Sequence, residues 1–131
     1  MKKKRINILA VAFLALLIIF ASAFLVRHYL QKTSDQLISM LDEIDGFVDK
    51  GSWDEAYAKM NDIDEAWEKK EKVWGMVINH HEIDNISISL KSALIYIDLN
   101  DEVDSLASLA SLRHYIGHIP IMERMSLKNI I

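Results

Sequence analysis

The sequence predicts an all-α protein, with one N-terminal transmembrane helix followed by a small bundle of about four helices in antiparallel hairpins. Two observations lead to this prediction. The 131 residues include only one proline and four glycines, so few turns interrupt the chain, and 51% of the residues are hydrophobic. Apolar residues also recur at helical spacing along most of the chain, which indicates helices that bury one face.

The first element is a membrane segment. Residues 8–26 carry no charge, and a helix of that length rises roughly 28 Å, close to the thickness of a bilayer's hydrocarbon core. Four cations precede it at residues 2–5, and such a cluster stays in the cytoplasm. We therefore predict a single-pass protein of the cell membrane, with a cytoplasmic basic tail over 1–5, a signal-anchor in contact with membrane lipid over 6–26, a juxtamembrane stalk over 27–33 and an acidic extracytoplasmic domain over 34–131.

The alternative for this segment is a cleaved secretory signal peptide. Ala21-Ser22-Ala23 has the small-x-small form of a cleavage site, and the cations ahead of it fit the basic start of such a peptide. The apolar run is longer than the usual hydrophobic region of about 7 to 15 residues, which favours an uncleaved anchor. Cleavage after Ala23 stays open here, and both interpretations export residues 34–131.

Charge is unevenly distributed along the chain. The formal net charge is −4, but residues 34–131 hold all nineteen acids against nine basic residues, which gives −10. An acidic surface repels phosphate, so we expect no nucleic-acid partner, and the same charge disfavours docking of this part on an anionic lipid surface. The chain has no cysteine, which excludes disulfides, thiol catalysis and thiolate metal sites.

The exported part is expected to begin with a helical hairpin. One apolar stripe at helical spacing marks its first helix, and it consists of Leu37, Leu41, Ile44 and Val48. Lys50-Gly51 provides a cation and a glycine where that helix should end. Ser52 and Glu55 then match a capping box, in which the serine hydroxyl accepts from a free backbone N–H and the glutamate reaches back. The short link predicts that the next helix packs antiparallel on the first.

Two further helices are expected on either side of an Asn100-Asp101-Glu102 turn. The stretches NISISL and LIYIDL before it alternate like strands, but a longer helical stripe over residues 82–99 favours helix. After the turn, the chain is expected to leave the helix near Gly117 and to start a last short helix at Pro120. The stripe consists of Ile83, Ile86, Leu90, Leu94 and Ile97, and three more apolar residues would make this helix the most buried: Ile88, Ile95 and Leu99.

A heptad series distinguishes the second helix of the exported part. Residues seven apart return to within about 20° of the same helical face. The series, which we name the tryptophan seam, consists of Trp53, Met60, Trp67, Trp74 and His81. Buried, these side chains fill the space between helices, and this interpretation is favoured. Exposed, they would form a groove for a partner helix or peptide.

Histidines are the natural candidates for metal or acid–base chemistry. His80, His81 and Asp84 lie close together in the sequence, and His118 follows His114 by four residues. The second spacing can place two imidazoles on one helical face, as in zinc-binding helices, but the HExxH form is absent and no convincing nucleophile accompanies the histidines. We therefore predict a non-enzymatic protein with no catalytic residue and no cofactor, and keep a metal-binding protein or metal-dependent hydrolase as the alternative.

The chain resembles a family catalogued only as a domain of unknown function. The residues that carry the resemblance are Trp53, Trp67 and Trp74, the HHEID stretch from His80, and the terminal SLKNII. The family consists of short, N-terminally membrane-anchored proteins of Gram-positive, mainly spore-forming bacteria. The resemblance implies no catalytic residues. It suggests a membrane partner, because members are similar to products encoded beside YetF-like integral membrane proteins. The expected function is that of an accessory or interaction protein for another membrane or envelope protein.

Overall fold

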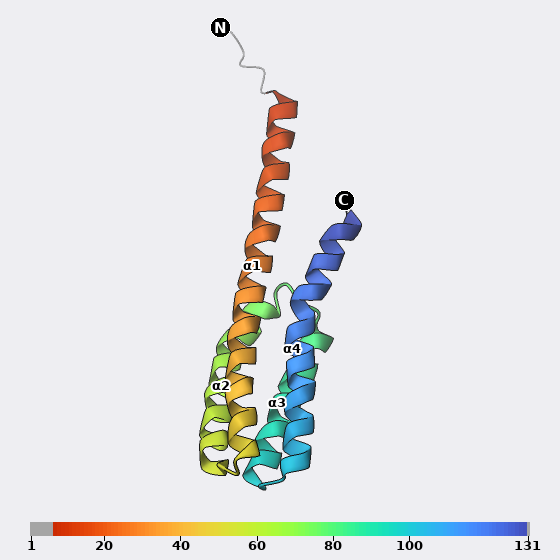
Figure 1. The fold of residues 1–131 in the computed structure, drawn as a ribbon. Helices are drawn as coiled ribbons and strands as arrows, with labels where there is room; N and C mark the ends of the chain where they lie inside the picture. Colours follow the sequence, from red (N-terminus) through yellow and green to blue (C-terminus); the bar gives the residue numbers. More distant parts are fainter. Residues whose placement is uncertain (1–6, 131) are drawn as a thin grey trace.

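Four helices form an up-and-down bundle in the computed structural model, which describes residues 7–130 and the side chains of residues 7–122. Each helix packs on the next along the chain, and the last packs on the first. Figure 1 shows that the first helix extends well beyond the others at one end. The predicted all-α bundle is confirmed, and its helices are α1 (Ile8–Asp49), α2 (Trp53–Trp74), α3 (His80–Asp98) and α4 (Glu102–Ile130).

Helix α1 is one continuous helix of 42 residues with two different surroundings. Over residues 8–26, the apolar segment, the large side chains are exposed except that of Val26, which is half-buried against the core. None of the most apolar part of this segment is buried. Among residues 7–130, α1 alone is long and apolar enough to cross a membrane. The bundle begins inside the stretch assigned from sequence to the stalk, since Leu30 and Thr33 are already buried. The predicted basic tail, residues 1–5, lies outside the described residues.

The link between α1 and α2 is as tight as the sequence predicts. Gly51 has a φ of 70°, a left-handed conformation that glycine adopts without steric cost. The Ser52 N–H donates to the Phe47 carbonyl at 2.8 Å. Ser52 occupies the N-cap of α2, but its side chain makes no cap hydrogen bond, so the predicted capping box with Glu55 is wrong. The acids in the first turn still suit the positive end of the helix dipole.

The core contains one stripe from each helix. The stripes predicted for α1 and α3 are nearly inaccessible, apart from half-buried Leu94. Ile88, Ile95 and Leu99 are instead 65%, 58% and 67% exposed, so the expectation that α3 is the most buried helix is wrong. In this arrangement each helix packs against two neighbours and turns one face inward, which leaves the outer face of α3 uncovered by the chain.

Pro120 lies inside α4, where it is buried, so the expected helix end near Gly117 is wrong. A proline has no N–H for the carbonyl four residues earlier, which here belongs to Ile116. The Ser34 hydroxyl of α1 donates to that carbonyl at 3.0 Å in the interior of the bundle. A side chain from the neighbouring helix thus replaces the hydrogen bond that the proline removes, and this satisfies the carbonyl that α4 would otherwise leave unpaired.

We expect the Ser34 and Pro120 substitutions to be energetically coupled. Ser34→Ala leaves the Ile116 carbonyl buried without a donor and should lower the free energy of unfolding by about 1–3 kcal/mol. In a Pro120→Ala background, the new N–H can bond the same carbonyl, so Ser34→Ala should cost less. Thermal unfolding of the four chains in detergent, followed by circular dichroism, completes the double-mutant cycle. Equal costs in both backgrounds would mean that Ser34 contributes through packing alone.

Candidate functional site

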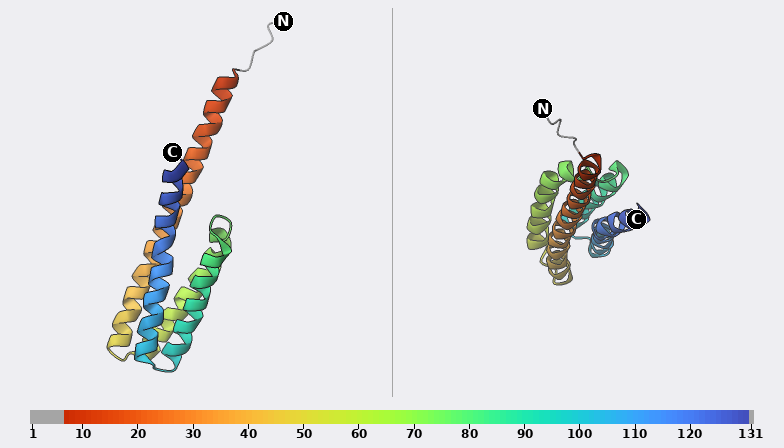
Figure 2. Two further views of the ribbon diagram at one scale, coloured as in Figure 1. Left: turned by 90° about the vertical axis from the view of Figure 1, so that its right-hand side faces the viewer. Right: turned by 90° about the horizontal axis from the view of Figure 1, so that it is seen from above.

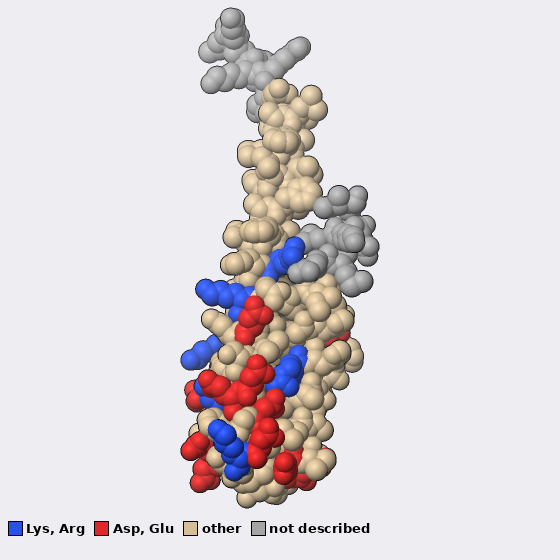
Figure 3. Space-filling view, in the orientation of Figure 1, with Lys and Arg blue, Asp and Glu red and all other residues tan. Residues whose placement is uncertain are grey.

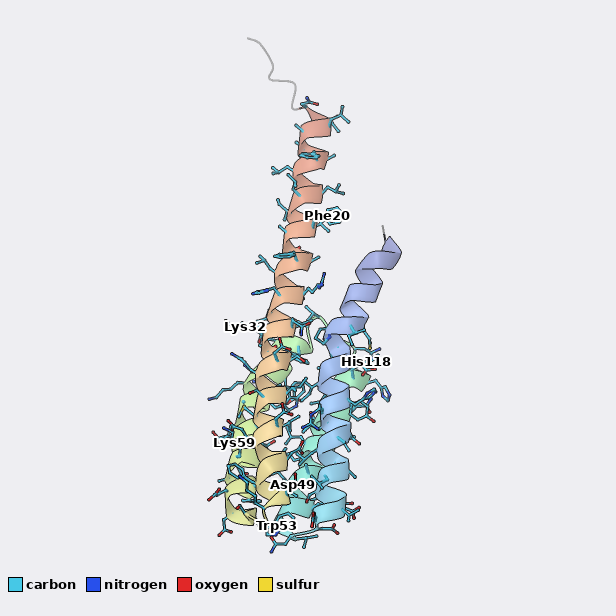
Figure 4. All side chains as sticks on the ribbon, viewed as in Figure 1. Phe20, Lys32, Asp49, Trp53, Lys59 and His118 are labelled. Carbon is cyan, nitrogen blue, oxygen red and sulfur yellow. The ribbon has the colours of Figure 1, made fainter. Side chains whose placement is uncertain are left out.

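The tryptophan seam is closed by the protein's own helices. Met60, Trp67 and Trp74 are at most 2% exposed, and half-buried Trp53 packs against the same core. The Trp67 and Trp74 rings meet edge to face with centroids 5.3 Å apart. Trp67 Nε1 donates to Ser87 Oγ of α3 at 2.9 Å. Figure 4 shows Trp53 at the end of the bundle away from the apolar segment. Trp67 and Trp74 are therefore core residues, and Trp67 joins α2 to α3.

His81 does not continue the seam, and the prediction that placed it there is wrong. Helix α2 ends at Trp74, and residues 75–79 form a link before α3 begins at His80. The heptad count therefore runs across a break between two helices. Asn79 Oδ1 accepts a hydrogen bond from the His81 N–H at 2.9 Å and caps α3. Both His80 and His81 are exposed in the first turn of that helix.

The candidate metal ligands lie in two groups on different helices. His80, His81 and Asp84 are exposed on α3, whereas His114 and His118 are exposed on α4 with stacked rings 5.6 Å apart. Figure 4 shows His118 on the upper part of α4. Within the described residues, no group of three or more His, Asp or Glu side chains is placed to hold a metal ion. Two imidazoles alone supply half of the four ligands that zinc usually takes.

Arg113 ties α4 to α1 through two carboxylates. Its guanidinium bonds Asp42 Oδ1 at 2.9 Å and also pairs with Asp45. Burial lowers the pKa of Arg113, but the hydrogen bonds and negative charges of Asp45 and Asp42 outweigh burial and raise that pKa above its ordinary value. The side chain therefore stays charged and acts as a structural clamp. Two further ion pairs join neighbouring helices, Lys59 with Glu43 and Lys91 with Asp64.

A groove of about 820 Å³ lies between α1 and α2. Lys32 and Lys70 contribute cations to its lining from opposite helices, while Met40 and Ala66 contribute apolar surface. Asp35 is the acid in this lining, and its Oδ1 accepts a hydrogen bond from the Gln31 side chain at 2.9 Å. Cations beside apolar surface suit an amphipathic anion.

Most of the chain matches one known protein family. The family model described as a domain of unknown function (DUF4363) matches residues 24–130. The chain belongs to this family. The resemblance to a family catalogued as a domain of unknown function is therefore confirmed. No curated protein and no solved structure gives a significant match. The DUF4363 match covers the bundle and only the last three residues of the apolar segment, Phe24 to Val26.

Two features of this DUF4363 domain were missed in the sequence, although one of them has a local signal. Asn79 followed by Glu82 three residues later is a pattern typical of a helix start. It marks the beginning of α3, and it indicates that the tryptophan seam stops at Trp74. The groove has no such signal, because Lys32 and Lys70 meet only when the hairpin of α1 and α2 has formed.

Substitutions in the seam of the DUF4363 domain should separate its buried members from His81. Trp74→Ala removes a fully buried ring and should lower the free energy of unfolding by about 3–5 kcal/mol. His81→Ala, the matched control, removes an exposed side chain and should change it by less than about 0.5 kcal/mol. Chemical denaturation of the full chain in detergent micelles measures both. A comparable loss in the free energy of unfolding for the two variants would mean that His81 packs in the core with the tryptophans.

Proposed function

We propose that the chain is a membrane-anchored accessory protein whose helical bundle lies outside the cytoplasm and binds another membrane or envelope protein. The observation that carries this proposal is α1, in which one helix joins an unburied apolar segment to a packed bundle. A segment that is apolar on all sides and uncovered by protein is stable in hydrocarbon, where a helix satisfies its own backbone hydrogen bonds.

The charges on the two sides of this segment support the orientation. Residues 2–5 are four consecutive cations, whereas the bundle is strongly acidic. The positive-inside rule retains the cationic tail in the cytoplasm and exports the rest. The bundle would then stand on the outer side of the cell membrane, with residues 1–5 inside.

An interaction role is favoured over catalysis by the way in which the bundle is held. Helix α1 runs without a break from the apolar segment into the core, so the bundle keeps a fixed position relative to the membrane. Confinement of this kind raises the effective concentration of the bundle near a membrane neighbour. A YetF-like membrane protein is the partner that the family resemblance suggests.

The outer face of α3 is the first place to look for that partner. Ile88 and Ile95 are seven residues apart and are 65% and 58% exposed. Exposed apolar side chains on one helical face are what protein interfaces bury. A photo-crosslinking residue at Ile88 or Ile95 should capture a membrane protein in living cells, whereas one at exposed Glu65 on α2 should capture far less. Recovery of the uncrosslinked chain alone from all positions would contradict the proposal.

Cysteine labelling tests the orientation cleanly because the chain has no cysteine of its own. Asp54→Cys should react with a membrane-impermeant maleimide in intact cells of a host with a single membrane. Lys3→Cys should react only after the membrane is made permeable. The opposite pattern would reverse the orientation. The mass of the labelled chain also reports cleavage, since loss of residues 1–23 would identify a signal peptide in place of an anchor.

A further inference from the structure

The link between α2 and α3 points to a second membrane contact, made by the bundle itself. We propose that this link (75–79), together with the last two residues of α2 (73–74), rests on the surface of a bilayer containing anionic lipid, beside the apolar segment of α1. Apolar side chains of the link enter the interface, and lysines at the end of α2 contact headgroup phosphates. This inference rests on the membrane anchorage proposed above and adds a contact that anchorage does not require.

The register of the α1–α2 hairpin sets the level of the link. Lys59 of α2 pairs with Glu43 of α1. Counting fifteen residues from this pair along the two antiparallel helices leads to Trp74 on α2 and His28 on α1. The link after Trp74 is therefore level with the end of the apolar segment at Val26. Figure 1 and the left view of Figure 2 both show the link at the end of the bundle from which α1 continues, with the end of α4 also reaching past the link.

The side chains at this level are apolar and uncovered. Met76 is 82% exposed, and Val73 and Val77 are 44% and 40% exposed. Ile78, which is 8% exposed, packs in the core and holds the link in place, while the side chains of Met76 and Val77 stay on the outside. Moving methionine and valine side chains out of water lowers their free energy. An interface beside the α1 segment is the nearest apolar environment available to them.

Positive charge gathers at the same end of the bundle. Residues 27–33, at the same level on α1, and residues 69–84, which contain the link, hold five cations and three acids. Residues 34–68 hold two cations and eleven acids. Figure 3 shows this separation, with acidic side chains dominating the end opposite the apolar segment. The cations near the link are Arg27, Lys32, Lys69, Lys70 and Lys72, and the acids are Glu71, Glu82 and Asp84.

The groove between α1 and α2 offers a place for a headgroup. Lys32 and Lys70 are each eleven residues from the Glu43–Lys59 pair, so they lie at one level on opposite helices and both line the groove. Lysine binds a phosphate as a point charge, and this groove has two lysines and one acid, Asp35, in its lining. His28 lines the end of the same groove nearest the apolar segment.

The proposed contact departs from the expectation that the net charge of residues 34–131 disfavours an anionic lipid surface, because charges act locally. Fields from exposed charges decay over about 8 Å at physiological ionic strength. The acids at the far end of the bundle lie several helical turns from Lys70, so they act weakly on headgroups near the link. The sign of the nearest charges decides whether an anionic surface attracts the bundle.

Fluorescence of a single labelled cysteine in nanodiscs tests the contact on the full-length chain. A polarity-sensitive probe on Met76→Cys should shift its emission to the blue and be quenched by lipids that carry a nitroxide near the headgroup. The matched control is Leu99→Cys, because Leu99 is also an exposed apolar residue (67%) but lies at the turn between α3 and α4. Its probe should stay unquenched. A probe on Phe13→Cys reports the anchor independently.

Charge variants test the choice of lipid. The charge variants are compared in nanodiscs containing phosphatidylglycerol at low salt, with the quenching of the probe at residue 76 giving the ratio of membrane-docked to undocked link. That ratio should fall about fivefold in each of three variants: Lys69→Gln, Lys70→Gln and Lys72→Gln. Lys50→Gln, at the far end, should leave that ratio unchanged. In phosphatidylcholine alone, the lysine variants should behave like the parent chain. Circular dichroism of every variant verifies that the helices are intact.

The outcomes separate this inference from the proposed function. Quenching at residue 13 without quenching at residue 76 in either lipid would overturn the docking and leave the anchor standing. Absence of quenching at residue 13 would overturn the anchor itself. Equal quenching at residue 76 with and without phosphatidylglycerol, unaffected by the lysine variants, would overturn recognition of anionic headgroups.

Discussion

One unbroken helix with two kinds of surface is the constraint on which the rest of the structure depends. Helix α1 is apolar on every side over residues 8–26 and apolar on one stripe from Leu30 to Val48. The other helices pack where α1 offers that stripe, because only there does a single face need covering. The change in pattern therefore sets where the bundle begins. Because the helix does not bend away at that point, it also brings the α2–α3 link level with the end of the apolar segment.

Polar groups make the packing of this apolar bundle specific. The Ser34 hydroxyl compensates for Pro120 by bonding the Ile116 carbonyl, and Trp67 reaches Ser87 across to α3. Sliding α4 along α1 by one turn would leave that carbonyl buried and unpaired, at a cost of about 1–3 kcal/mol. Apolar stripes alone tolerate such a shift more easily, since one leucine packs much like another. These two bonds, together with the Arg113 clamp, thus fix the register that apolar contacts leave loosely defined.

The sequence predicts what depends on local periodicity and misses what depends on partners far along the chain. The stripes of α1 and α3 follow from the 3.6-residue repeat, and both are buried as predicted apart from half-buried Leu94. A seven-residue repeat cannot distinguish one helix from two when a break falls between its members, so His81 was counted with Trp74. Pro120 looks like a helix end until Ser34, 82 residues away from Ile116, supplies the missing bond. Periodicity also places Ile88 and Ile95 near the core stripe without telling how many helices cover them.

The continuity of α1 has a mechanical consequence. A rigid rod that crosses a boundary transmits any inclination of its embedded part to its free part. From Leu30 to Asp49 the free part is roughly 28 Å long, so a change of about 10° in the inclination of the apolar segment moves the turn at Gly51 by roughly 5 Å. The other three helices are fastened to that rod and move with it. In the membrane-anchored arrangement proposed above, the thickness of the bilayer or a neighbouring protein that tilts the segment would thus move the acidic end of the bundle.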